Sequence, residues 1–146
     1  MTSVCPPLLF PEAWTRVRKA HRRLQKTAAL ELGIDPTVLC GVEKGTRAPF
    51  GEDQIALAVE RLELSEEEQE LLRWAAHHDR LVGHLLAKGA SSSELAFISA
   101  GLHALRHLQP QQVSGLTSNL RQIADSASLV ASLGRTKLTH TEAAMT

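Results

Sequence analysis

The 146-residue sequence contains very few aromatic residues: Phe, Trp and Tyr together make up 3% of the chain, and tyrosine is absent. Aromatic and β-branched residues favour strands, whereas Leu and Ala, which are abundant here, favour helices. A hydrophobic content of 43% and a charged content of 22% are ordinary for a folded domain. We therefore expect an all-α chain that is long enough to bury a core.

Cysteines and long apolar runs are also scarce. The two cysteines, Cys5 and Cys40, show no spacing typical of a disulfide framework or a metal site. The N-terminus lacks a charged-then-apolar signal, and no apolar run approaches the roughly 20 residues that a membrane-spanning helix needs. We expect a reduced, cytoplasmic and nucleoid-associated location, with no membrane partner.

The chain carries no net charge, because 16 basic residues balance 16 acidic ones. The two signs are nevertheless separated along the sequence. Residues 1–50 contain eight Lys and Arg against four Asp and Glu, whereas residues 51–100 contain four against ten. An excess of positive charge in the first third of the chain favours contact with a polyanion through that segment.

Catalytic signatures are missing as well. No nucleophile is paired with a base at a recognisable spacing, and no glycine-rich loop is present, so we expect neither an enzyme nor a cofactor. His103 and His107 share one helix face and offer a possible metal pair. Surface histidines are the favoured interpretation, and possible partners on the preceding helix are His77, His78, Asp79 and His84.

The segment from Gln25 to Lys44 predicts two short helices joined by a sharp turn. Gly33 falls where the first helix must end, because a left-handed C′ residue avoids a Cβ clash only as glycine. Asp35 is suited to cap the second helix, and Pro36 to occupy its first turn. Small or apolar residues at core-closing positions are Ala29, Leu32, Ile34, Leu39 and Val42.

Capping and periodicity predict five helices between residues 10 and 88. The first begins near Pro11 and buries Ala13, Val17, Ala20 and Leu24, with Trp14 at one edge. The fourth runs from about Glu52 to Leu62, and the fifth from a Ser65–Glu68 capping box to Lys88, with His78 on its apolar stripe. Residues 1–9 form an extended arm, residues 89–134 a helical hairpin, and residues 135–146 a disordered tail.

One set of residues comprises Gln25, Ala29, Gly33, Ile34, Leu39 and Val42, followed by VEKGTRAP from Val42 to Pro49. This set resembles the XRE family of bacterial and phage regulators, which includes phage repressors and Cro. The resemblance covers about Trp14 to Leu64. It implies a repressor-like helix-turn-helix fold and a sequence-specific transcriptional regulator that binds double-stranded DNA, as a homodimer on a palindromic operator. By position it implies DNA contacts from Arg18, Arg22, Arg23, Gln25, Lys26, Thr37, Cys40, Gly41, Lys44 and Arg47.

Cys40 and Gly41 differ from the Gln, Arg or Ser that many relatives present to the groove. This difference predicts sparse base readout, with shape and backbone contacts supplying more of the specificity.

The last two predicted helices, about Glu94–Leu108 and from Pro110 to Gly134, carry more apolar surface than a hairpin can bury against itself. We expect them to form the dimer through Leu95, Ile98, Leu102, Leu105, Val113, Leu116, Leu120, Ile123 and Val130. A second interpretation stays open, namely a protein-interaction module such as an antitoxin whose C-terminal helices bind another regulatory protein.

Overall fold

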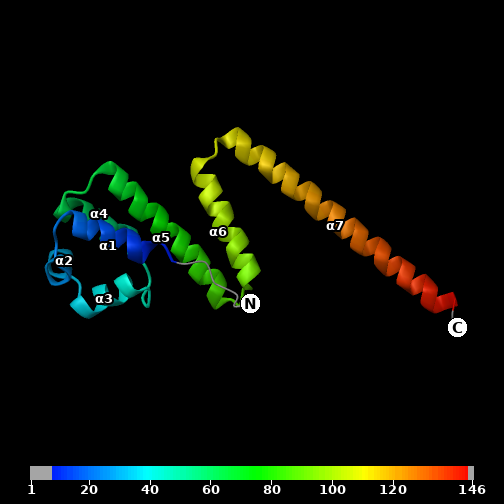
Figure 1. Cartoon of the computed structure of the whole chain (residues 1–146), viewed down its shortest axis with the longest axis horizontal. Helices are drawn as coiled ribbons and strands as arrows, with labels where there is room; N and C mark the ends of the chain where they lie inside the picture. Colours follow the sequence, from blue (N-terminus) through cyan, green and yellow to red (C-terminus); the bar gives the residue numbers. More distant parts are fainter. Residues whose placement is uncertain (1–7, 145–146) are drawn as a thin grey trace. The chain divides into compact units, whose positions relative to one another are not determined.

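The computed structural model describes residues 8–144, and the side chains of residues 8–135. Over this range it is all-α and contains no strand, which confirms the expected fold class (Figure 1). The chain divides into two compact units, Met1–Leu102 and His103–Thr146. The helices are α1 (Phe10–Ala20), α2 (Gln25–Leu32), α3 (Pro36–Lys44), α4 (Glu52–Leu62), α5 (Glu66–Ala87), α6 (Ser92–His107) and α7 (Pro110–Ala144).

An aromatic cluster lies at the centre of the first unit. Trp14 and Phe10 of α1 are fully buried, and both rings pack edge-to-face against Phe50, with centroid distances of 4.9 and 5.3 Å. The expected stripe of α1 was therefore wrong at three residues, because Ala20 and Leu24 are exposed and Trp14 is central rather than at one edge. The reason is Phe50, whose buried ring packs against the two largest side chains of α1.

The segment from Gln25 to Lys44 folds as two short helices, as its capping residues predict. Gly33 ends α2 in the left-handed conformation with a φ of 66°, and its N–H and that of Ile34 bond back to carbonyls of α2. The Asp35 carboxylate accepts the Thr37 N–H at 2.7 Å and caps α3. Ala29 and Leu39 are fully buried where α2 and α3 approach one another.

The expected bounds of α4 and the expected capping box of α5 are confirmed. α4 spans Glu52–Leu62 and ends at Glu63, which takes a left-handed φ of 53°. Ser65 Oγ accepts the Glu68 N–H, and the Glu68 carboxylate accepts the Ser65 N–H at 3.0 Å. α5 stops before Gly89, which has a φ of 87°, so the serine-containing link begins where the sequence places it.

The first half of α6 belongs to the same unit as α1–α5. Leu95 is 1% exposed and Ser99 is 8% exposed, so the side of α6 that bears them is buried in this unit. The boundary between units lies inside α6, at Leu102, and not at the link near Gly89. Burial of Leu95 and Ser99 is the physical reason for this shift.

α7 continues through Gly134, where the sequence predicts an end, and reaches Ala144. The expectation of a disordered tail was therefore wrong for the backbone of residues 135–144. Gly134 is not among the glycines with positive φ, and no proline follows it, so nothing local terminates the helix. None of the described helices combines the length and the apolar character that crossing a membrane requires.

Candidate nucleic-acid interface

The outer surface of α3 presents few polar side chains. Thr37 and Lys44 are exposed, Cys40 is half-buried, and Gly41 is buried. Of the four positions expected to face a ligand from this helix, only two therefore offer an accessible hydrogen-bonding group. The expectation that Gly41 contacts DNA is corrected, because the Arg47 side chain lies over it.

Arg47 lies across the α3 backbone at Gly41. A Cβ built on Gly41 would come within 2.8 Å of both Cγ and Cδ of Arg47, which is closer than real side chains approach. The Gly41 carbonyl also accepts the N–H groups of Thr46 and Arg47, at 2.9 and 3.2 Å. Glycine inside a helix costs about 1 kcal/mol relative to alanine. Here it provides the space in which the chain turns back and lays Arg47 over α3.

Glu43 joins three helices through a polar network that the sequence did not indicate. Its side chain is only 7% exposed, and it accepts hydrogen bonds from Arg18 Nε at 2.9 Å, Thr15 Oγ1 at 3.1 Å and Gln25 Nε2 at 2.6 Å. Arg18 also donates from Nη1 to the Arg23 carbonyl at 2.8 Å. The network links α1 to the first residue of α2 and to the last turn of α3.

This network changes the role of two expected contact residues. Arg18 is 8% exposed and paired with Glu43, so its guanidinium is not presented to a phosphate, contrary to the expectation. The Gln25 side-chain amide is half-buried and directed at Glu43. The start of α2 lacks a side-chain cap, so its first backbone N–H groups are the donors that remain there.

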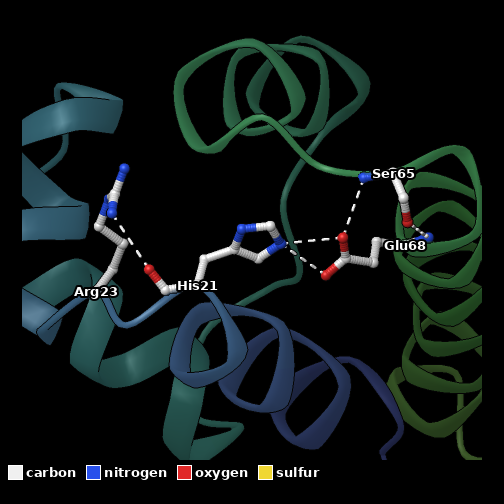
Figure 2. A network of polar contacts seen from close by, with 4 residues as sticks. All are labelled: His21, Arg23, Ser65 and Glu68. Atoms are coloured by element: carbon white, nitrogen blue, oxygen red, sulfur yellow. Dashed lines mark hydrogen bonds and ion pairs between the residues drawn. The ribbon is translucent and has the colours of Figure 1, made fainter.

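The turn between α1 and α2 is held from two sides (Figure 2). His21 Nε2 lies 2.9 and 3.0 Å from the two carboxylate oxygens of Glu68 on α5, and Arg23 Nη1 donates to the His21 carbonyl at 3.2 Å. Between them Arg22 takes a left-handed φ of 55° and is exposed. A left-handed arginine is uncommon, because its Cβ crowds the following carbonyl.

The basic side chains of the first fifty residues divide into those that form ion pairs and those that form none. Arg16 pairs with Glu12, Arg18 with Glu43, and Arg23 with Glu31, so three acidic residues neutralise three basic ones. Among the described residues up to position 50, five exposed cations make no ion pair: Lys19, Arg22, Lys26, Lys44 and Arg47. Four of these lie on or directly beside α2 and α3.

Two carboxyl groups near this surface have lowered pKa values. The Thr37 N–H, donating to Asp35, holds the pKa of this capping carboxyl below its usual range. Burial by itself raises the pKa of Glu68, but hydrogen bonds from the Ser65 N–H and from His21 outweigh burial and lower it. Both groups are thus committed to structure as carboxylates.

A second buried polar chain runs from α6 to the start of α1. Ser99 Oγ and Asp79 Oδ1 each lie 2.8 Å from a ring nitrogen of His78, which is fully buried. The Asp79 carboxylate also accepts the N–H groups of Leu9 and Phe10 at 2.8 to 3.0 Å. Asp79 therefore caps α1 from a distance of 69 residues in the sequence.

The Ser99–His78–Asp79 chain has the connectivity of a hydrolytic triad, which the sequence did not reveal. Its burial decides its role. Ser99 is 8% exposed and His78 is fully buried, so Ser99 Oγ is not presented to a substrate. Its hydrogen bonds instead tie α6 and α5 to the first turn of α1.

The expected dimer residues divide into three groups by exposure. Leu95 is buried within the first unit, so it is not available to a second copy, and the expectation for this residue is corrected. Ile98, Leu102 and Val113 are half-buried. The side chains that remain on the surface are Leu105, Leu116, Leu120, Ile123 and Val130, which are 40% to 69% exposed.

Within the described residues, no group of three or more His, Cys, Asp or Glu side chains is placed to hold a metal ion. Comparisons with protein-family models, with curated proteins and with solved structures find no match to this chain.

Proposed function

We propose that the chain is a sequence-specific DNA-binding regulator of the helix-turn-helix type, acting through α2 and α3. The observation that carries the proposal is the set of cations that stay unpaired beside these helices: Arg22, Lys26, Lys44 and Arg47. Elsewhere in the first fifty residues Arg18 and Arg23 pair with the shielded carboxylates of Glu43 and Glu31, and Arg16 pairs with the exposed Glu12. Positive charge left exposed around this helix pair favours a polyanion such as DNA.

The two helices have distinct tasks in this proposal. α3 enters the major groove, where Thr37 and Lys44 reach base edges. α2 meets the backbone with its uncapped N-terminus, where free N–H groups and Lys26 bind a phosphate. Arg47, lying across α3, adds a third cation to the surface that enters the groove.

Base readout through α3 is sparse. Gly41 is covered and Cys40 is half-buried, so few donors from the helix contact bases directly. We therefore assign part of the specificity to the shape and the deformability of the DNA. A homodimer on a palindromic operator then increases discrimination, because two half-sites about one helical turn apart must both fit.

The dimer contacts in this proposal come from α7 and the second half of α6. Along α7 the seam of Val113, Leu116, Leu120, Ile123, Ala127 and Val130 follows alternating steps of three and four residues, as in a coiled coil. The e and g positions, which flank the seam in each heptad between Pro110 and Gly134, carry no charged residue. Two copies therefore meet no like-charge repulsion at these positions.

The test is fluorescence anisotropy with random-sequence and operator-selected duplexes over a series of salt concentrations. With roughly four to eight phosphate contacts per dimer, the slope of log affinity against log salt is expected at about −4 to −7. Lys26→Ala should reduce this slope by about one per subunit, whereas Lys88→Ala, on the far end of α5, should leave it unchanged. A flat dependence would falsify the proposal.

A second candidate function is a protein-interaction module, in which α7 binds another regulatory protein. It is favoured by the exposed apolar side chains of α7, which need a covering surface of some kind. Purification from the source cells distinguishes the two. Co-elution with a second polypeptide at equal amounts, and no binding to duplex DNA, supports the interaction module.

A further inference from the structure

A pocket of about 440 Å³ opens beside the loop that follows α3. Its walls come from four segments of the first unit: residues 8–11, Val42 of α3, residues 45–49, and the last turns of α5. This volume lies in the range of sites that take small organic ligands. The pocket does not belong to the proposed DNA-contacting surface, although Arg47 lines both.

Gly83 forms part of the pocket wall. It lies in the interior of a helix, where glycine is less favourable than most other residues. It lies within the 22-residue helix α5, and a Cβ added to it would meet no atom within 4 Å outside its own helix. No close neighbour requires a glycine there, in contrast to Gly41. The missing side chain leaves open space beside Gly83, on the wall of the pocket.

The lining of the pocket combines apolar side chains with two arginines. Leu8, Phe10, Pro11, Val42 and Pro49 supply the apolar surface. Arg47 and Arg80 also line the pocket, and Arg80 Nη1 donates to the Phe50 carbonyl at 3.2 Å, which positions the guanidinium.

The one carboxylate in the wall, Asp79, already accepts hydrogen bonds from two backbone N–H groups and lies against His78. The remaining titratable side chain in the wall is His84, which is exposed. Two guanidinium groups therefore outnumber one occupied carboxylate.

We infer that this pocket binds a small organic anion with an apolar body, such as an aromatic or short aliphatic carboxylate. The apolar part of the lining takes the body, and Arg80 and Arg47 take the carboxylate, because guanidinium groups match the planar geometry of that group.

A second step rests on the proposed function. Since Arg47 lies across α3 and also lines the pocket, a ligand that draws Arg47 toward the pocket removes it from the DNA-contacting surface. The bound anion therefore weakens DNA binding.

The experiment measures ligand binding without DNA, so its result does not depend on the proposed function. 1-Naphthoate is titrated into the full chain by calorimetry, and the neutral isostere 1-naphthamide serves as the control ligand. We expect saturable binding of naphthoate, with naphthamide at least about tenfold weaker. Equal affinity for the two ligands, or no binding of naphthoate, overturns the proposal.

Three variants locate the site. Gly83→Leu fills the open space and should abolish naphthoate binding, while Gly115→Leu, an equally unhindered helical glycine in α7, should bind like the unaltered chain. Arg80→Met keeps the apolar stem and should weaken binding about tenfold. Binding that survives in Gly83→Leu places the ligand elsewhere and overturns the assignment.

The regulatory step is then measured on DNA. Saturating naphthoate should lower the DNA affinity of the unaltered chain by about tenfold and leave that of Gly83→Leu unchanged. Naphthoate binding with no change in DNA affinity overturns the regulatory step alone. If no DNA binds in any arm, the proposed function fails while the ligand site stands on the calorimetry.

Discussion

Single polar side chains connect elements that are far apart in this sequence. Glu43 binds Arg18 across 25 residues, and Asp79 binds the start of α1 across 69. Each of these two carboxylates accepts hydrogen bonds from several fixed protein donors instead of from water. These hydrogen bonds compensate for the cost of burying the charge. Such residues are the ones whose loss leaves a partner unsatisfied in a dry site.

Glu43→Ala should therefore destabilise the chain strongly. It leaves the Arg18 guanidinium buried with only a carbonyl partner, which typically costs about 3–5 kcal/mol. Glu31→Ala, which breaks the more exposed pair with Arg23, serves as the control and should cost less than about 1 kcal/mol. Urea unfolding followed by circular dichroism measures both. Equal losses in the two variants would contradict the role of Glu43.

Arg22 and Glu63 make a matched pair, because each is a non-glycine residue with a left-handed φ. Glycine at either position relieves the crowding of Cβ and should stabilise the fold by about 1 kcal/mol, as seen in thermal unfolding. Only Arg22→Gly should also weaken DNA binding, since it removes an exposed cation beside α2. If both variants bind DNA like the unaltered chain, Arg22 has no contact with the phosphate backbone.

At the scale of elements, α3 depends on a residue outside it. Gly41 accommodates Arg47, and the helix gives up intrinsic stability in return for that placement. The displaced group in an alanine variant is a flexible side chain, so the fold has an inexpensive way to adjust.

Gly41→Ala should leave stability unchanged or raise it by up to about 1 kcal/mol, while weakening DNA binding as much as Arg47→Ala does. In the Arg47→Ala background, Gly41→Ala should cause no further loss, because the residue that it displaces is already gone. Additive losses in this double-mutant cycle would show that Gly41 acts on DNA by itself.

The start of α5 should be sensitive to acid through Glu68. Its folded pKa lies below the usual value of 4.5, so the folded chain holds this proton less tightly than the unfolded chain. Its contribution to the free energy of unfolding is present above about pH 5 and is lost as the pH falls through 4.5 toward the lower folded value. Glu68→Gln should flatten this part of the pH profile, whereas Glu66→Gln should leave its shape unchanged. The readout is chemical unfolding between pH 3 and 7.

At the scale of the whole molecule, the two units differ in how much surface they bury. The first has a core of aromatic and aliphatic side chains, while the described side chains of α7 are almost all exposed. An isolated helix of this length gains little from propensity alone, so its apolar seam needs a partner surface.

Replacing both Leu120 and Ile123 with Asp should convert a dimer to a monomer in sedimentation equilibrium. The matched control replaces Ser118 and Ser128 with Asp, which adds the same charge to α7 away from the heptad seam. The control should remain dimeric and bind DNA normally. A full-length chain that is monomeric before any substitution would remove the basis for a coiled-coil dimer.

Local patterns in the sequence were sufficient for most helix boundaries. Gly33 and Gly89 mark helix ends with positive φ, Asp35 and Ser65 cap helices as expected, and α4 has the bounds that its periodicity predicts. These signals act within one turn of helix, so a sequence read in order contains them. The end of α7 was missed because Gly134 is only one of the signals that termination requires.

What the sequence alone determined about this protein is therefore an all-α chain, the positions of its caps and turns, and the concentration of positive charge around residues 1–50. Only the tertiary structure decided which charges are neutralised, as with Arg18 and Glu43, and which glycines make space, as Gly41 does for Arg47 and Gly83 for the pocket. The physical reason is distance along the chain. A cap depends on neighbours three residues away, whereas a buried ion pair or a pocket depends on helices that meet only when the core forms.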